Sequence, residues 1–253
     1  MNRATPARES SRVARAAALP ALLAPVAVLA ARGIGGPAPL PILATLAIYP
    51  VLVLLILRQM RRTAAVATLF WAASLSVSVI VSTERDPGAM ETVVLNGAAY
   101  RDEMFAFIRS GQGRESDPAL FLPQHLLHLG AFCLLAWVSA GLLGIALGAL
   151  LVAYMSYYVG SLAAAGGAPA VALAFGWPPW AVLRVVAFVL LGLALSEPLL
   201  LAIRRRVETA CSDSFPPWRA WYLTAAALLA ADALLKLLLA PSWAGLLRPC
   251  LAP

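Results

Sequence analysis

Long, mostly apolar runs with few or no charges, separated by polar segments, dominate the chain. A membrane-spanning helix needs about 20 apolar residues, and five runs approach that length: 16–31, 40–57, 63–82, 180–203 and 220–240. A further run, 125–162, has only two histidines as ionisable groups, and as one helix it would measure about 57 Å. Because that is too long for one crossing, we expect a hairpin near Ser139 to Gly141. The pattern therefore predicts an all-α polytopic transmembrane helix bundle with seven spans, six being the alternative.

The one long hydrophilic segment, 83–123, predicts an amphipathic helix at the membrane surface. It holds seven acidic residues, and its middle, 90–109, contains no proline and a single glycine. We expect 90–109 to lie along the bilayer surface and to end before Gly111. The Gly/Pro-rich segment 163–179 predicts a loop or a re-entrant segment, and Pro241 predicts the end of the last span.

Composition excludes a water-soluble globule. The 253 residues are 62% hydrophobic and 12% charged, whereas soluble domains carry about 25% charged residues. We therefore expect a basic N-terminal tail, 1–16, and a single membrane domain, 17–253, with the lipid bilayer as its surroundings. The net charge of +7 comes almost entirely from arginines at the ends of the spans, which does not favour nucleic-acid binding. Three widely spaced cysteines predict no redox or metal-binding pair.

Arginine clusters predict the orientation of the bundle. Cytoplasmic loops are enriched in Lys and Arg, and with seven spans the N-terminal tail, 58–62 and 204–206 all fall on one side. The sequence therefore predicts a cytoplasmic N-terminus and an extracytoplasmic 83–123 loop. The Ala/Arg/Pro-rich usage favours a bacterial protein, and hence the inner membrane. We interpret the first apolar run as an uncleaved span, with a secretory signal as the alternative.

Several polar residues converge on the predicted extracytoplasmic side. His125 and His128 are three residues apart and so share one helix face, and Glu103 is on the predicted surface helix. Imidazole and carboxylate groups suit acid–base catalysis, so we identify these three residues as candidate catalytic groups. They are also candidate ligands of a divalent metal such as zinc, with Glu91 as an alternative third ligand. The simpler alternative is that the histidines only meet lipid head groups and Glu103 is solvated.

Two charges in the last span form a second candidate feature. Asp232 and Lys236 are four residues apart, a spacing that predicts an intramembrane ion pair. Glu197, near the other end of the preceding span, is expected to pair with nearby arginines. The tyrosines of 154–158 predict an interfacial aromatic belt.

Three functions are compatible with these features. The first is an intramembrane hydrolase, protease or transferase acting on an exported protein or a lipid, with Glu103, His125 and His128 in the site. The second is a transporter or permease component that uses Glu197, Asp232 and Lys236. The third is a non-catalytic membrane subunit or assembly factor that binds a membrane partner protein through the 83–123 loop.

Overall fold

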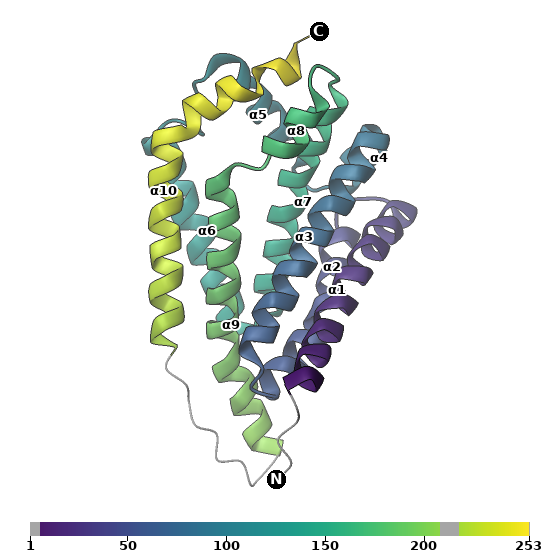
Figure 1. Ribbon diagram of the computed structural model, residues 1–253, viewed down its shortest axis with the longest axis vertical. Coiled ribbons are helices and arrows are strands. Elements are labelled where there is room, and N and C mark those ends of the chain that lie inside the picture. Colours follow the sequence, from purple (N-terminus) through teal and green to yellow (C-terminus); the bar gives the residue numbers. More distant parts are fainter. Residues whose placement is uncertain (1–5, 208–217, 253) are drawn as a thin grey trace.

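The protein is a bundle of helices that run between two ends (Figure 1). The computed structural model describes residues 6–207 and 218–252, with side chains from residue 18 onward. Within these ranges there is no strand, six helices are long and apolar enough to cross a membrane, and α1 adds a shorter apolar stretch, Ala18–Ile34. The predicted all-α polytopic bundle is confirmed.

The helix bounds follow the apolar runs closely. In chain order the elements are α1 (Pro6–Ile34), α2 (Pro39–Leu57), α3 (Arg61–Arg85), α4 (Pro87–Val93), α5 (Gly97–Ser110), α6 (Pro118–Val138), α7 (Leu142–Ala164), α8 (Pro169–Phe175), α9 (Pro179–Val207), α10 (Arg219–Leu247) and the short 3-10 helix η1 (Arg248–Leu251). The predicted hairpin separates α6 from α7, where Ala140 and Gly141 both have positive φ.

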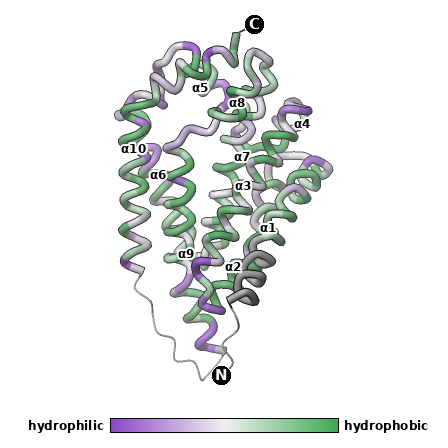
Figure 2. Tube along the Cα trace, viewed as in Figure 1, coloured by the Kyte–Doolittle hydropathy of each residue, from purple (hydrophilic) through white to green (hydrophobic). Residues whose placement is uncertain are grey.

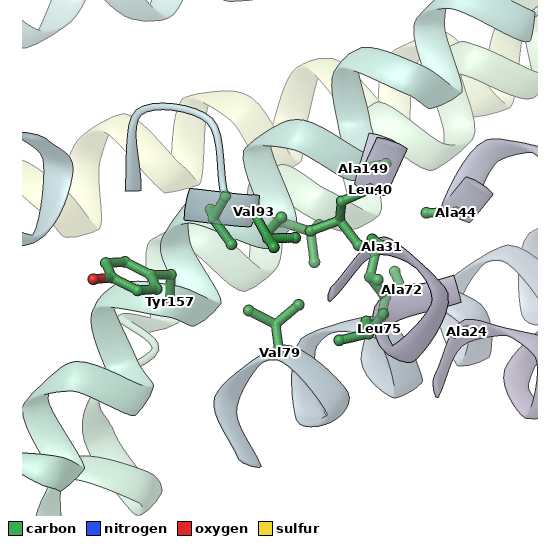
Figure 3. Packing of buried hydrophobic residues seen from close by; sticks show 14 of the residues in the cluster. Ala24, Ala31, Leu40, Ala44, Ala72, Leu75, Val79, Val93, Ala149 and Tyr157 are labelled. Carbon is green, nitrogen blue, oxygen red and sulfur yellow. The ribbon is translucent and has the colours of Figure 1, made fainter. Parts of the chain in front are cut away.

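Small side chains allow the helices to approach closely. One buried cluster joins α1, α2, α3, α4 and α7 and is rich in alanine, including Ala24, Ala44 and Ala72 (Figure 3). Where α3 meets α7, a Cβ added at Gly160 would lie 2.7 Å from both the Ile80 carbonyl oxygen and the Thr83 Cβ. Such contacts between small residues are the usual basis of helix association in a membrane, where water does not drive apolar surfaces together.

The two ends of the bundle differ in their charges, and Figure 2 shows hydrophilic segments at both. The arginine-rich end holds residues 58–62 and 204–206, and the Arg204 Nη1 donates to the Leu57 carbonyl oxygen at 2.9 Å. The opposite end, called the α5 end here, holds α4, α5, α8 and η1, and Figure 1 places the C-terminus there. This arrangement puts the two arginine clusters at one end and the 83–123 segment at the other.

Four features differ from the sequence-based predictions. The surface helix predicted over 90–109 is divided into α4 and α5, because Asn96 adopts a left-handed conformation and Gly97 packs against the Tyr157 ring too closely to admit a Cβ. The 163–179 segment contains a short helix, α8. The last span continues past Pro241 to Leu247, and Figure 1 shows the C-terminal part of α10 bending across the α5 end.

The fourth difference concerns the tyrosines of 154–158, which do not form a belt facing lipid. Tyr157 and Tyr158 are fully buried. The predicted tail, 1–16, lies outside the described residues over 1–5, and Cys211 also lies outside them.

Candidate functional site

A partly buried arginine on α9 pairs with a buried aspartate on α10. The Arg184 Nε and Nη2 donate to the two carboxylate oxygens of Asp232 at 2.9 and 2.8 Å. The Asp232 side chain is 3% exposed, so almost all of its hydration is replaced by this two-pronged contact, the geometry that arginine and carboxylate match best. Sequence reasoning missed Arg184, although a charged residue in a mostly apolar span normally requires a partner.

A lysine one turn further along α10 reaches a glutamate from the 111–117 loop. The Lys236 Nζ lies 2.8 Å from the Glu115 Oε2, with the lysine side chain 2% exposed and the glutamate side chain 13% exposed. The ammonium also lies 4.7 Å from the centre of the Phe121 ring. Glu115 therefore turns inward from a polar loop, and together with the arginine–aspartate pair it forms a cluster of four charges, called the charge cluster here.

Asp232 and Lys236 share one helix face, as their spacing predicts, but each has its ion-pair partner in another segment. The acid pairs with Arg184 and the ammonium with Glu115. The predicted direct pair is thus replaced by two pairs that tie α10 to α9 and to the loop before α6. The cause is geometric: a bidentate guanidinium satisfies both oxygens of the carboxylate, and Glu115 reaches the lysine.

Both histidines line a cavity beside the charge cluster, and His125 also contacts the cluster itself. The His125 Nε2 is 3.5 Å from the Lys236 Nζ, and its Nδ1 is 4.0 Å from an Asp232 oxygen. The His128 ring has no hydrogen bond to the part of the chain that the structure describes. Asp117 accepts from the Ala119 amide at 2.9 Å and so caps the start of α6, which positions both histidines.

Glu103 is held away from the histidines by Arg114, whose Nε lies 3.3 Å from its Oε1 at the protein surface. Glu91, the alternative third ligand, pairs with Arg101 at 2.9 Å and accepts from the Tyr157 hydroxyl at 3.1 Å. Among the described residues, no three His, Cys, Asp or Glu side chains gather in a way that could hold a metal ion. The predicted three-ligand set is therefore not assembled, because arginines engage both glutamates.

A cavity of about 300 Å³ lies between the spans beside the charge cluster. It follows α9 from Arg184 to Ser196, which is about 18 Å of helix at about 1.5 Å per residue. Its ionisable groups gather near one end, where His125, His128, Tyr154, Arg184 and Asp232 contribute to the wall. The remaining wall is mostly apolar and includes Leu52, Trp71, Leu129, Phe132, Gly144, Gly148, Val152, Val185, Phe188, Val189, Leu193 and Leu229.

Aromatic residues cover the α5 end of the cluster. The rings of Tyr100 and Tyr154 lie 4.7 Å apart, and Tyr158 meets Tyr100 edge-on at 6.0 Å. Burial raises the pKa of Tyr100 well above its usual value, and the negative charge of Glu115 raises it further. Tyr100 therefore stays protonated at neutral pH and keeps its hydroxyl group as a hydrogen-bond donor.

A separate ion pair holds the arginine-rich end. Glu197 is 1% exposed, and its carboxylate accepts from the Arg61 Nε at 2.8 Å. The Arg61 guanidinium also lies 5.3 Å from the Trp218 ring. The prediction that Glu197 pairs with a nearby arginine is confirmed. The pair joins α3 to α9, far along α9 from Arg184.

Comparison with protein-family models, with curated proteins and with solved structures found no match for this chain. The geometry of the charge cluster, the histidines and the cavity is therefore the basis on which a function is proposed.

Proposed function

We propose that this protein is a membrane-embedded hydrolase or transferase that acts on a lipid, or on an exported protein presented from the bilayer, at the α5 end of the bundle. The observation that carries the proposal is the cavity, which is apolar over most of its length and meets His125, His128 and Arg184 at one end. Enclosed apolar sites with a few convergent polar groups are where small molecules bind and react. The positive-inside rule supports an extracytoplasmic position for this end, in a bacterial inner membrane with the N-terminus in the cytoplasm.

The charges of the site favour an uncharged reacting group. Arg184 and Lys236 are balanced by Asp232 and Glu115, so the charge cluster has no formal net charge to attract an anion. An ester or amide carbonyl meets this requirement. Arg184 is also well placed to donate to a developing oxyanion, because its guanidinium belongs to the cavity wall and has more N–H donors than Asp232 accepts.

The two histidines take different parts in the proposed reaction. His125 is held by the lysine and the aspartate, which suits a positioning role. His128 lines the cavity, and its ring makes no hydrogen bond to the described residues, so both ring nitrogens are available to a substrate. It is therefore the proposed general base. The His128 imidazole accepts a proton from water, or from the hydroxyl of an acceptor, as that oxygen bonds to the carbonyl carbon. It returns the proton to the leaving oxygen or nitrogen as the old bond breaks.

Lipid turnover by the purified protein tests this function. Wild-type protein in phosphatidylethanolamine liposomes is expected to convert lipid to a lysolipid or a transfer product, measured by mass spectrometry. The His128→Ala variant should be slower by about 10²- to 10⁴-fold, the usual contribution of a general base. Leu127→Ala, on the same helix but 69% exposed, is the matched control. Equal rates in His128→Ala and wild type, with both proteins folded, would overturn the proposal.

Transport is the second candidate function, and the pairing of four charges among α9, α10 and the 111–117 loop favours it. Ionisable groups within spans often mark ion or substrate pathways. Flux across liposomes distinguishes the two functions. A transporter would lose flux on Asp232→Asn and keep it on His128→Ala. The proposed enzyme would lose product formation on His128→Ala and would carry no flux in either protein.

A further inference from the structure

Resting on the proposed function, we propose that a bilayer lipid enters the cavity sideways between α6 and α10, and that one of its hydrocarbon chains lies along α9 as far as Leu193. The substrate class is thereby a chain-bearing membrane lipid with an uncharged or zwitterionic head. Such a route needs three things: an opening in the membrane-facing wall, a closed aqueous end, and an apolar path of sufficient length.

The opening is formed by residues that belong to the cavity wall and to the outer surface at once. Leu122 and Leu126 on α6 are 41% and 66% exposed and both line the cavity. Ala230 on α10 is also exposed and also lines it. All three are in helices that are long and apolar enough to cross a membrane, so this side of the cavity faces lipid chains.

The aqueous end is closed by the charge cluster and its aromatic neighbours. Lys236 is almost wholly buried, and its contacts to Glu115, His125 and Phe121 join α10, the 111–117 loop and the start of α6 above the opening. A water-soluble substrate arriving from the α5 end would have to break these contacts. A lipid arriving through the wall leaves them intact.

The path beyond the histidines suits a hydrocarbon chain. Small residues leave the space, since a Cβ added at Gly148 meets no atom within 4 Å, and Val189 and Leu193 give α9 an apolar surface. From Val185 to Leu193, α9 contains no charged side chain. A lipid with its chain here would bring its carbonyl region to the histidines, while its second chain stayed in the bilayer.

Photocrosslinking in vesicles tests the route without requiring turnover. The protein is reconstituted into phosphatidylethanolamine vesicles that contain a trace of the same lipid with a photoreactive group near the end of one acyl chain. After illumination, mass spectrometry of peptides is expected to find label on the α7 and α9 segments that line the cavity. The double variant Leu126→Trp/Ala230→Trp narrows the opening and should reduce that label at least fivefold.

The matched control is Leu127→Trp, because Leu127 is 69% exposed on the same helix and does not line the cavity. Its labelling should equal that of wild type. A second variant, Gly148→Phe, fills the cavity from within. Its control is Gly130→Phe, because Gly130 is an exposed glycine with open space around it. Folding of each variant is checked by its unfolding temperature in detergent.

The outcomes separate this inference from the proposed function. Cavity labelling that falls in Leu126→Trp/Ala230→Trp and Gly148→Phe but persists in His128→Ala supports lateral entry, whether or not any lipid is turned over. Labelling confined to the outer surface of the bundle, or cavity labelling unchanged by both plugging variants, overturns it even if the protein proves to be an enzyme.

Discussion

Lys236 on α10 and Glu115 on the loop before α6 are joined at 2.8 Å, although 121 positions separate them in the chain. Because the lysine side chain is 2% exposed, it depends on this single carboxylate for much of its stabilisation. The pair therefore fixes how the loop sits on the spans.

Removing the carboxylate should destabilise the protein strongly. Glu115→Gln leaves a buried ammonium without its charged partner, and breaking such a pair typically costs about 3–5 kcal/mol. The double variant Glu115→Gln/Lys236→Met should recover much of the loss, since the buried charge is then gone. Thermal unfolding in detergent measures both. Glu103→Gln, which breaks the exposed contact to Arg114, is the control and should change stability by about 0–1 kcal/mol. Equal effects of Glu115→Gln and Glu103→Gln would contradict the assigned burial.

Arginine, and not only a positive charge, is required at position 184. Arg184→Lys keeps the charge but loses the two-pronged contact to Asp232, and we expect it to cost about 1.5–3 kcal/mol, the worth of one hydrogen bond to a charged group. Unfolding midpoints of Arg184→Lys and of the exposed control Arg109→Lys are compared under the same conditions. A midpoint for Arg184→Lys that matches wild type would show that the paired geometry is dispensable.

Tyr100 should contribute to the stability of the protein at alkaline pH. Its pKa is raised in the folded protein, first by burial and then by Glu115. The phenol is protonated in both folded and unfolded states below about pH 10, so its stabilising contribution is complete there. Between about pH 10 and the higher folded pKa, the unfolded chain releases a proton that the folded chain retains, so stability falls as pH rises. Tyr100→Phe should flatten this fall.

The measurement is the unfolding temperature between pH 8 and pH 11. Tyr222→Phe, at a more exposed residue on α10, is the comparison and should flatten the fall less than Tyr100→Phe. A decline of identical steepness in wild type and Tyr100→Phe would contradict the assignment.

Because α3 and α7 are in close contact at Gly160, we expect any larger residue at this position to destabilise the protein. An alanine there would place its Cβ 2.7 Å from a backbone oxygen of α3, so the helices must separate, and overpacking of this kind costs about 1–3 kcal/mol. Gly130→Ala, at an exposed glycine with nothing within 4 Å, should be neutral or slightly stabilising, because alanine favours helix. Unfolding midpoints test the pair. The packing argument fails if both substitutions have the same effect.

The sequence was informative wherever a single segment determined the outcome. Apolar runs of the length of a bilayer defined the spans, and the glycine at 141 marked the hairpin. The charge cluster depends on pairings between segments that are distant in the chain, so only part of it could be predicted from the sequence. Arg184 could have been found as a positive charge inside the predicted span 180–203. Nothing local distinguishes Glu115 from the other acids of the 83–123 loop, because tertiary packing decides which one turns inward. Pro241 was misread because a proline inside a membrane helix is tolerated when neighbouring groups satisfy the backbone.

Helix α10 continues past Pro241, so one helix contacts two parts of the molecule. Before the proline it supplies Asp232 to the wall of the cavity and Lys236 to the charge cluster beside it. After the proline, Trp243 stacks on Phe107 of α5 with ring centres 6.4 Å apart. The Arg248 Nε, just beyond the helix, donates to the Ile108 carbonyl oxygen at 3.2 Å. Because both sets of contacts belong to α10, its parts before and after Pro241 are mechanically coupled. A tilt of the first part that widens the gap to α6 therefore also moves the second part over α5.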